Sequence, residues 1–275
     1  MKAGIDLGTT AVKIAWRNED ASHGFLSLDH DDDIAGRLAG MGITKLRSTG
    51  IGGRPPAGFD ASGPSGDPIE DEIAVQADGV RRLFGLQDGP RGDFLLVSIG
   101  TGTSYTLVPK EGTPRRFPIG NAIGGGFIAG VAAMQMIDIT EIEESAKKGS
   151  HLDLLVKDLL PSKAGTLEGE FVVSHFGKLG DPRFVPERLD RESDPVDDHC
   201  ATIVHCAAVT VIRDALILGM IPGFAADDIV FIGTPVAKLT ALRGHLERFA
   251  AMLGRRAHFP ERGEYAAALG ALYAD

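Results

Sequence analysis

The fold of this chain is decided by a stretch near its N-terminus, AGIDLGTTAVK at residues 3–13. A similar stretch, VSIGTGTSY, follows at residues 97–105. In both, small residues lie where one predicted strand ends and the next begins. Glycine permits the positive φ angles of such a turn, and small side chains let backbone N–H groups approach an anion closely. Two such turns in one chain indicate a nucleotide held between two similar halves.

The predicted elements follow the same order around both turns. The first half has strands at 2–6, 11–16, 25–28 and 45–49, with one helix at 33–40 before the last strand. A Gly-, Pro- and Ser-rich loop at 54–68 then leads into a second helix, which runs from Pro68 to about Leu83. The second half repeats the order with strands at 94–99, 104–108, 115–119 and 228–232, and with a helix at 126–136.

Three further helices and one strand complete the predicted second half. The helices lie at 198–219, 236–251 and 264–273 and the strand at 256–259, after an irregular insertion at 138–197. The apolar stripe of the helix at 198–219 is wider than one buried face needs, so this helix is predicted to lie in the core or at an interface.

The composition excludes several classes of protein. The chain has 275 residues, of which 43% are hydrophobic and 24% charged, as in ordinary globular domains. Its formal net charge of -10 argues against nucleic-acid binding, which needs a basic surface. We find no run of about 18 apolar residues that would cross a membrane. The N-terminus enters a strand at once, which leaves no room for a signal peptide, so we expect a cytoplasmic protein.

Cysteine and histidine give no sign of a metal site. The two cysteines, Cys200 and Cys206, are six residues apart in a predicted helix. This spacing places them on different faces, which disfavours a disulfide or paired metal ligation and favours buried thiols. The eight histidines show no metal-like spacing, and we expect them to be structural.

The duplicated order is neither a Rossmann fold nor a P-loop fold, because neither glycine motif of those folds is present. It resembles instead the superfamily of actin, the heat-shock chaperone ATPases and the sugar kinases, whose members bind ATP in a cleft between two such domains. The resemblance implies an α/β fold of duplicated ribonuclease H-like domains. They would span residues 1–88 and 89–275, with a helical insertion at about 138–220 and the helix at 264–275 packing on the first domain.

Within that superfamily the chain resembles the type II pantothenate kinases. The matching stretches lie at 4–13, 71–79, 99–104, 119–130, 153–158, 174–177, 229–234 and 263–272. The resemblance implies an ATP-dependent transferase that phosphorylates pantothenate to 4'-phosphopantothenate, the first step of coenzyme A biosynthesis. It also implies ATP and Mg²⁺ as cofactors and a homodimer with an interface near the helix at 198–219.

Asp6 is the candidate metal ligand, because a carboxylate at the end of the first strand can hold Mg²⁺, directly or through water, against the phosphates of ATP. A turn-capping role is the alternative. The resemblance makes Lys13 a phosphate-binding cation, although an exposed strand lysine would look the same. The other residues implied in nucleotide binding are Gly8, Thr9, Thr10, Gly100, Thr101, Gly102, Gly124, Gly125, Gly126 and Gly233. A tight turn packed on the sheet is the alternative for residues 124–126.

Glu72 is the implied catalytic base. It precedes the helical Gly79 by seven residues, as the catalytic glutamate of the family does. A carboxylate favoured by the helix dipole is the alternative. The resemblance places Thr101 and Ser104 near phosphate and substrate, and Arg116 at the substrate carboxylate, which a guanidinium binds through two hydrogen bonds. The family arginine precedes the triple glycine by seven residues, whereas Arg116 precedes it by eight and Arg115 by nine, so the arginine that binds substrate stays open.

Other functions remain open at this point. The acceptor is pantothenate, pantetheine or another hydroxylated molecule. A sugar kinase of the same fold often carries a zinc site of clustered cysteines, and a dehydratase-activating ATPase needs cysteines for an iron–sulfur cluster. Two cysteines in one helix suit neither. A non-catalytic nucleotide switch of the actin or chaperone kind is the third alternative.

Overall fold

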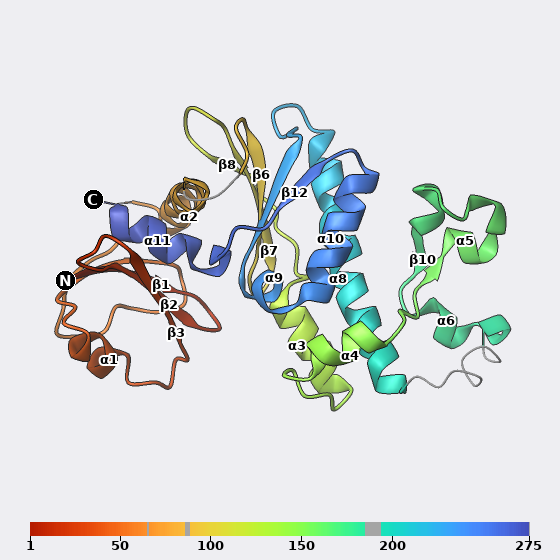
Figure 1. The fold of residues 1–275 in the computed structure, drawn as a ribbon, viewed down its shortest axis with the longest axis horizontal. Helices are drawn as coiled ribbons and strands as arrows, with labels where there is room; N and C mark the ends of the chain where they lie inside the picture. The colour runs from red at the N-terminus through yellow and green to blue at the C-terminus, as the bar shows by residue number, and fades with distance from the viewer. Residues whose placement is uncertain (65, 86–88, 185–193, 275) are drawn as a thin grey trace.

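Two five-stranded mixed sheets form the two halves of the molecule (Figure 1). This computed structural model describes residues 1–64, 66–85, 89–184 and 194–274. The first sheet has the order β3-β2-β1-β4-β5. Its strands are β1 (Lys2–Leu7), β2 (Val12–Arg17), β3 (His23–Leu28), β4 (Lys45–Thr49) and β5 (Asp60–Ser62). β1 pairs antiparallel with β2 and parallel with β4, so the first glycine turn is a hairpin at the centre of this sheet.

The second sheet repeats the topology of the first. Its order is β12-β11-β6-β7-β8, with β6 antiparallel to β7 and parallel to β11. Its strands are β6 (Phe94–Ile99), β7 (Thr103–Val108), β8 (Arg115–Arg116), β11 (Asp228–Ile232) and β12 (Arg256–His258). β6 therefore takes the place of β1, and the second glycine turn is again the hairpin beside the central strand. The repeated order confirms the predicted duplication.

The structure corrects three details of the prediction. The loop expected at 54–68 contains β5, which pairs parallel with β4. The third strand of the second half, expected to reach residue 119, is only the short β8. The helix expected at 236–251 is two helices, α9 (Thr234–Lys238) and α10 (Thr240–Met252), because Leu239 between them is extended, with φ -106° and ψ 95°.

Helices cover both faces of the second sheet. On one face, α3 (Gly125–Met134), α8 (Pro195–Gly219) and α10 contribute to one hydrophobic core, which also includes α4 (Ile142–Lys148). The rest of the insertion precedes α8 in the chain. It includes β9 (Leu154–Leu155), α5 (Val156–Leu159), β10 (Val172–Ser174) and α6 (Gly177–Gly180). In Figure 1 this part lies on the side of α8 away from the first sheet.

The helices α2 (Pro68–Phe84) and α11 (Ala266–Tyr273) lie between the two sheets (Figure 1). One hydrophobic core joins them to both sheets: Ala15 of β2 belongs to it, together with residues of β6, β7 and β11. A separate core under the other face of the first sheet includes Leu38 of α1 (Ile34–Gly40). The helix pair is therefore the packing element shared by the two halves. The predicted domain boundary at residue 88 lies outside the described residues.

Glycines bring this helix pair into direct backbone contact. A Cβ on Gly79 of α2 would lie 1.8 Å from the carbonyl oxygen of Ala266. One on Gly270 of α11 would lie 1.7 Å from the carbonyl oxygen of Val75, and one on Gly4 of β1 would lie 2.0 Å from that of Ala268. No side chain fits at these three positions, so glycine fixes the separation of α2, α11 and β1.

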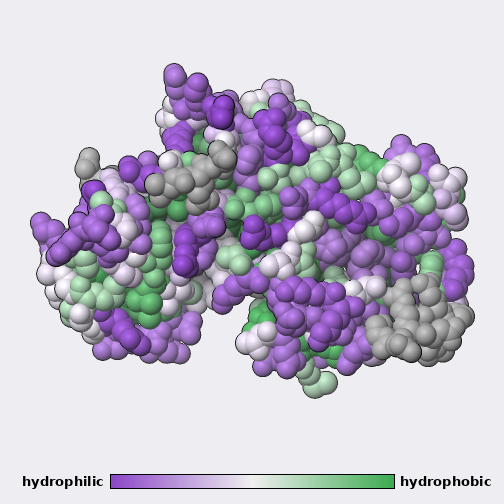
Figure 2. Space-filling model, viewed as in Figure 1, coloured by the Kyte–Doolittle hydropathy of each residue, from purple (hydrophilic) through white to green (hydrophobic). Residues whose placement is uncertain are grey.

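One helix has the length and composition of a membrane span, which the sequence reading did not expect. It is α8, with a mean hydropathy of 1.7 over its most apolar window. About two thirds of that window, 67%, is buried inside the fold, as in the core helix of a globular protein. Figure 2 shows a largely polar face, with apolar side chains in separate patches and a notch between the half formed by the first sheet and α3.

The glycine contact predicts that substitution by alanine changes the stability in opposite directions at two helical glycines, Gly79 and Gly244. Alanine normally stabilises an exposed helix position by up to about 1 kcal/mol relative to glycine. Gly79→Ala should instead lower the free energy of unfolding by roughly 2 kcal/mol or more, because its Cβ forces α2 and α11 apart. Gly244 of α10 is the control, since a Cβ there meets nothing within 4 Å. Urea denaturation measures both; a stabilised Gly79→Ala protein would contradict the packing argument.

Candidate active site

The two glycine-rich turns meet through their hydroxyl groups. The Thr101 Oγ1 atom of the second turn lies 2.7 Å from Oγ1 of Thr9 and 2.9 Å from Oγ1 of Thr10, both in the first turn. All three residues are exposed. The turns lie at the carboxyl ends of β1 and β6, where ligands bind in open α/β sheets. The structure thus brings together the two motifs that the sequence singled out.

The triple glycine holds the second turn in place. The amide of Gly125 donates to the carbonyl oxygen of Gly100 at 2.7 Å, and that of Gly126 donates to the oxygen of Thr101 at 2.9 Å. A Cβ on Gly124 would lie 2.7 Å from the same Thr101 oxygen. These two amides are therefore engaged within the protein, so the tight-turn alternative describes what this segment does in the structure.

A glycine pair supports the first turn in a similar way. The amide of Gly52 donates to the carbonyl oxygen of Leu7 at 2.7 Å, and a Cβ on Gly52 would lie 2.2 Å from the oxygen of Gly8. Gly50 has φ +85°, and a Cβ there would lie 2.7 Å from Oδ1 of Asp6. The sequence analysis gave residues 50–53 no role in the site, although Gly50 and Gly52 support the first turn.

Four of the predicted charged groups form one electrostatic cluster. Asp6 and Lys13 are direct partners in the β1–β2 register. Burial raises the pKa of Asp6, while the nearby Lys13 ammonium lowers it. Burial also raises the pKa of Glu72, the carboxylate of Asp6 raises it further, and the charges of Arg116 and Lys13 lower it. The structure therefore places the candidate base, metal ligand and two cations close enough to influence one another.

The two neighbouring arginines of β8 point in different directions. Arg116 is partly buried, its charge lowers the pKa of Glu72, and its Nε atom has no hydrogen-bond partner among the described residues. The Nη2 atom of Arg115 donates to the carbonyl oxygen of Gly223 at 2.5 Å, and its guanidinium lies 5.7 Å from the ring centre of Phe224. Of the pair that the sequence left open, Arg116 is the one that belongs to this cluster.

A buried ion pair lies immediately beside Glu72. The Nη2 atom of Arg47, on β4, bonds to Oδ1 of Asp71, and Thr49 donates to Oδ2 of Asp71 at 3.1 Å. Arg47 is 2% exposed. The sequence analysis missed this pair, because nothing in the KLRST stretch at residues 45–49 marks Arg47 as buried.

Two more predicted residues occupy the cleft-facing ends of the second sheet. Ser104 is partly buried and pairs in register with Ser98, whose Oγ atom accepts a hydrogen bond from Gln76 of α2 at 3.2 Å. Gly233 has φ +110°, and a Cβ there would lie 2.0 Å from the carbonyl oxygen of Ile99. Gly233 thus has a packing requirement of its own at the end of β11.

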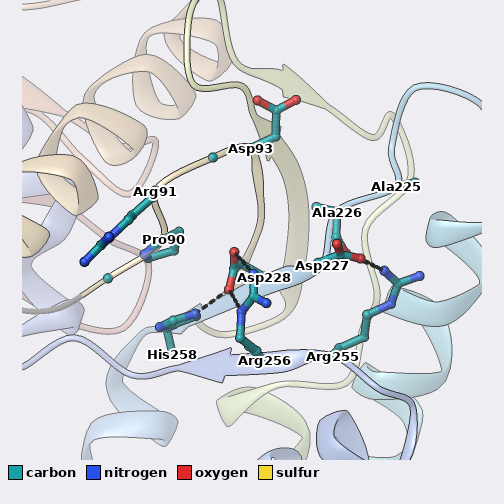
Figure 3. A pocket seen from close by; sticks show the side chains of 12 residues that line it. Pro90, Arg91, Asp93, Ala225, Ala226, Asp227, Asp228, Arg255, Arg256 and His258 are labelled. Atoms are coloured by element: carbon teal, nitrogen blue, oxygen red, sulfur yellow. Dashed lines mark hydrogen bonds and ion pairs between the residues drawn. The ribbon is translucent and has the colours of Figure 1, made fainter.

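A cavity of about 570 Å³ lies at the opposite, amino-terminal edge of the second sheet (Figure 3). The charged groups that line it at residues 227–228 and 255–258 are paired with one another: Asp228 bonds to Arg256 and His258 at 2.7 Å each, and Arg255 bonds to Asp227 at 2.5 Å. Cations neutralised in this way offer little to a phosphate group. The glycine turns at the other edge remain the candidate active site.

Comparison with known proteins identifies the family of this chain. The Fumble family model matches residues 87–274, more than half of the chain. The chain belongs to the Fumble family, that of the type II pantothenate kinases. It is 27% identical to the type II pantothenate kinase of Staphylococcus aureus strain USA300 over 284 aligned positions, which cover 99% of both chains. The identity is the same for the enzyme of the bovine strain RF122 / ET3-1. The predicted resemblance is confirmed.

Solved structures establish the fold of this Fumble-family chain. The activator of the 2-hydroxyisocaproyl-CoA dehydratase from Clostridium difficile, with bound ADPNP, has a TM-score of 0.62 and 17% identity, covering 99% of this chain and 93% of its own. Component A of the (R)-2-hydroxyglutaryl-CoA dehydratase of Acidaminococcus fermentans has a TM-score of 0.62 and 20% identity, covering 99% and 96%. The predicted duplicated actin-like ATPase fold is confirmed.

The ion pair beside Glu72 predicts a non-additive effect on stability. Arg47→Met should lower the free energy of unfolding by roughly 3 kcal/mol, because it leaves the carboxylate of Asp71 buried without its cation. The double variant Arg47→Met/Asp71→Leu should lose less than the single one, since both charges are then removed together. Urea denaturation of the two variants tests this. A double variant less stable than Arg47→Met would contradict the ion-pair account.

Proposed function

We propose that this protein is an ATP-dependent kinase that phosphorylates the primary hydroxyl group of pantothenate. The observation that carries the proposal is the junction of the two glycine turns beside the cluster of Asp6, Lys13, Glu72 and Arg116. Family membership and full-length similarity to type II pantothenate kinases support the choice of acceptor. Homodimer formation stays a prediction from the resemblance, and a cytoplasmic location stays a prediction from the sequence.

The hydroxyl cluster and Lys13 would receive the phosphates of ATP. A phosphate that enters between the turns exchanges the hydroxyl–hydroxyl bonds of Thr9, Thr10 and Thr101 for bonds to its own oxygens. The exchange keeps each hydroxyl satisfied, which lowers its cost. Lys13 adds a positive charge next to the first turn. This local cation offsets the net charge of the chain, which is -10 and disfavours an anion.

The residues present also fit the Mg²⁺ ion that accompanies ATP. Asp6 offers a hard oxygen donor at the end of β1, and its raised pKa shows a carboxylate that lacks solvation in the absence of a cation. The ion would supply charge neutralisation on the phosphates. Gly50 keeps space beside Oδ1 of Asp6, which any larger residue would fill.

Glu72 would take the proton of the acceptor hydroxyl. Its pKa is raised by burial and by Asp6, which moves it toward the range in which a carboxylate accepts a proton effectively. Positioning and charge neutralisation contribute most of the rate in phosphoryl transfer, and the base contributes a smaller share. Glu72 is fixed by its place on α2, and its backbone neighbour Asp71 is tied to β4 by Arg47.

Arg116 would bind the carboxylate of pantothenate. It is the cation of β8 that faces Glu72, and its unpaired Nε atom is a donor without an internal partner among the described residues. A carboxylate that accepts from Nε and one Nη atom would satisfy it in the bidentate geometry that arginine favours. This contact would set the distance between the carboxylate of the acceptor and its hydroxyl at Glu72.

A dehydratase-activating function has less support despite the shared fold. The solved activators resemble this chain at 20% identity or less, which carries the fold alone. An iron–sulfur cluster needs accessible thiolates. Both cysteines of this chain, Cys200 and Cys206, are buried in α8.

The acceptor is tested with purified protein, ATP, Mg²⁺ and a panel of pantothenate, pantetheine, N-acetylmannosamine and glucose. We expect a phosphoryl adduct by mass spectrometry on pantothenate, because only an acceptor with a carboxylate can use Arg116. Phosphorylation of a sugar alone would overturn the proposed acceptor, and ATP binding without any adduct would favour a nucleotide switch.

Glu72→Gln tests the base. The variant should lose roughly 10²- to 10⁴-fold in kcat, with the KM for ATP nearly unchanged, because the amide is isosteric but cannot take a proton. In the wild type, kcat should fall with decreasing pH at a value above about 4.3, the pKa of an ordinary glutamate, since a base with a raised pKa becomes protonated earlier as the pH falls. Wild-type turnover by Glu72→Gln would remove this residue from the mechanism.

The two arginines of β8 provide a matched pair of variants. Arg116→Ala should raise the KM for pantothenate by roughly 10- to 100-fold, through loss of a charged hydrogen bond, with a smaller effect on ATP. Arg115→Ala should leave both KM values close to wild type, because its guanidinium is engaged by Gly223 and Phe224. Steady-state kinetics with each substrate varied decides between them. A reversed pattern would move the carboxylate site to Arg115.

A further inference from the structure

A second cluster of chemically active side chains lies away from the glycine turns, between α8 and the insertion. One nitrogen each of His151 and His205 and one oxygen of Asp153 lie within 4.8 Å of one another. His151 and Asp153 precede β9, and His205 is on α8. None of the three is a predicted nucleotide or substrate residue. Because His205 lies 52 residues after Asp153 in the chain, no local spacing motif predicts the cluster.

Asp153 fixes the orientation of His205. Its side chain is fully buried, and its Oδ2 atom lies 2.6 Å from Nδ1 of His205 and 3.0 Å from Nδ1 of His175. The amide of Phe176 donates to its Oδ1 atom at 2.8 Å. Because the carboxylate accepts, Nδ1 of His205 carries the hydrogen, and Nε2 is the nitrogen with the free lone pair. This arrangement of carboxylate and histidine is the one that orients metal-binding imidazoles.

Two buried ring nitrogens in this cluster have no hydrogen-bond partner among the described residues. They are Nδ1 of His151 and Nε2 of His205, and His205 is only 1% exposed. A buried polar atom normally has a partner, and one that does not requires an explanation.

The rings are close but stacked. The centroids of His151 and His205 are 3.9 Å apart with an interplanar angle of 6°, and the ring of His245, from α10, meets His205 edge-on at 5.0 Å. A metal ion lies near the plane of each imidazole that binds it, so one ring has to turn out of the stack. His151 can turn, since it is only partly buried and precedes β9, whereas α8 and Asp153 hold His205.

We propose that this cluster is a binding site for a divalent transition-metal ion, with Zn²⁺ as the first candidate. The imidazoles of His151 and His205 are its donors, and Asp153 orients His205 through Nδ1. Imidazole nitrogens suit Zn²⁺ and its neighbours rather than Mg²⁺, which takes oxygen ligands. The ion would link the segment before β9 to α8 and would stabilise the insertion by its binding free energy.

The test uses the full chain without a histidine tag, free of nucleotide and Mg²⁺. After loading with ZnSO₄ and dialysis, the wild type should retain one zinc per chain by elemental mass spectrometry. Its Tm should rise by about 5 °C with micromolar Zn²⁺, since ligands of the folded state stabilise it. Absence of retained zinc together with an unchanged Tm would overturn the proposal.

His151→Phe separates the metal site from a purely structural histidine. Phenylalanine keeps the ring stack and removes the unpaired nitrogen, so the metal-free protein should be as stable as the wild type or more stable, while the zinc-dependent rise in Tm is lost. His199→Phe is the control, because His199 is also on α8 but outside the cluster, and it should keep the full response. His205→Gln, which removes the second donor, should also lose it. An undiminished response in both cluster variants would overturn the proposal.

Discussion

The contact between α2 and α11 is the constraint on which the rest of the structure depends. Three glycines, Gly4, Gly79 and Gly270, allow backbone to touch backbone where β1, α2 and α11 meet. The C-terminal helix thereby lies against the N-terminal strand, and the same helix pair belongs to a core shared with the second sheet. The separation of the two sheets is thus set by direct backbone contacts, and so is the position of the cleft between them.

The same helix determines where the candidate base lies. Glu72 and Gly79 are seven residues apart, about two helical turns and some 10 Å of rise, which places them on nearly the same face of α2. The face that must lack a side chain at Gly79 to meet α11 therefore carries a carboxylate two turns earlier, at the glycine turns. The spacing that the sequence analysis took from a family resemblance thus has a structural reason. The contact of Gly79 with α11 fixes the orientation of α2, and Glu72 takes its position from that orientation.

Much of the fold could be predicted because its signals are local. The glycine turns, the alternation of strands and helices and their repetition are each written in short windows, and the structure confirms them. The features that were missed depend on residues far apart in the chain. Arg47 meets Asp71 only because β4 and α2 adjoin. Three histidines, His151, His175 and His205, which were expected to be structural because their spacing shows no pattern, gather around Asp153 only in the folded chain.

The site also shows how an acidic chain can hold an anion. Two carboxylates, Asp6 and Glu72, are placed near the cations Lys13 and Arg116, and burial raises the pKa of both acids. Each acid disfavours ionisation of the other, so two buried carboxylates are costly to keep charged in the free protein. A divalent cation next to Asp6 would favour the charged form of that carboxylate, and a carboxylate of the acceptor would pair with Arg116, with Glu72 left as the basic group between them. The charges of the free protein therefore favour a metal-bound nucleotide beside Asp6 and an acidic acceptor beside Arg116.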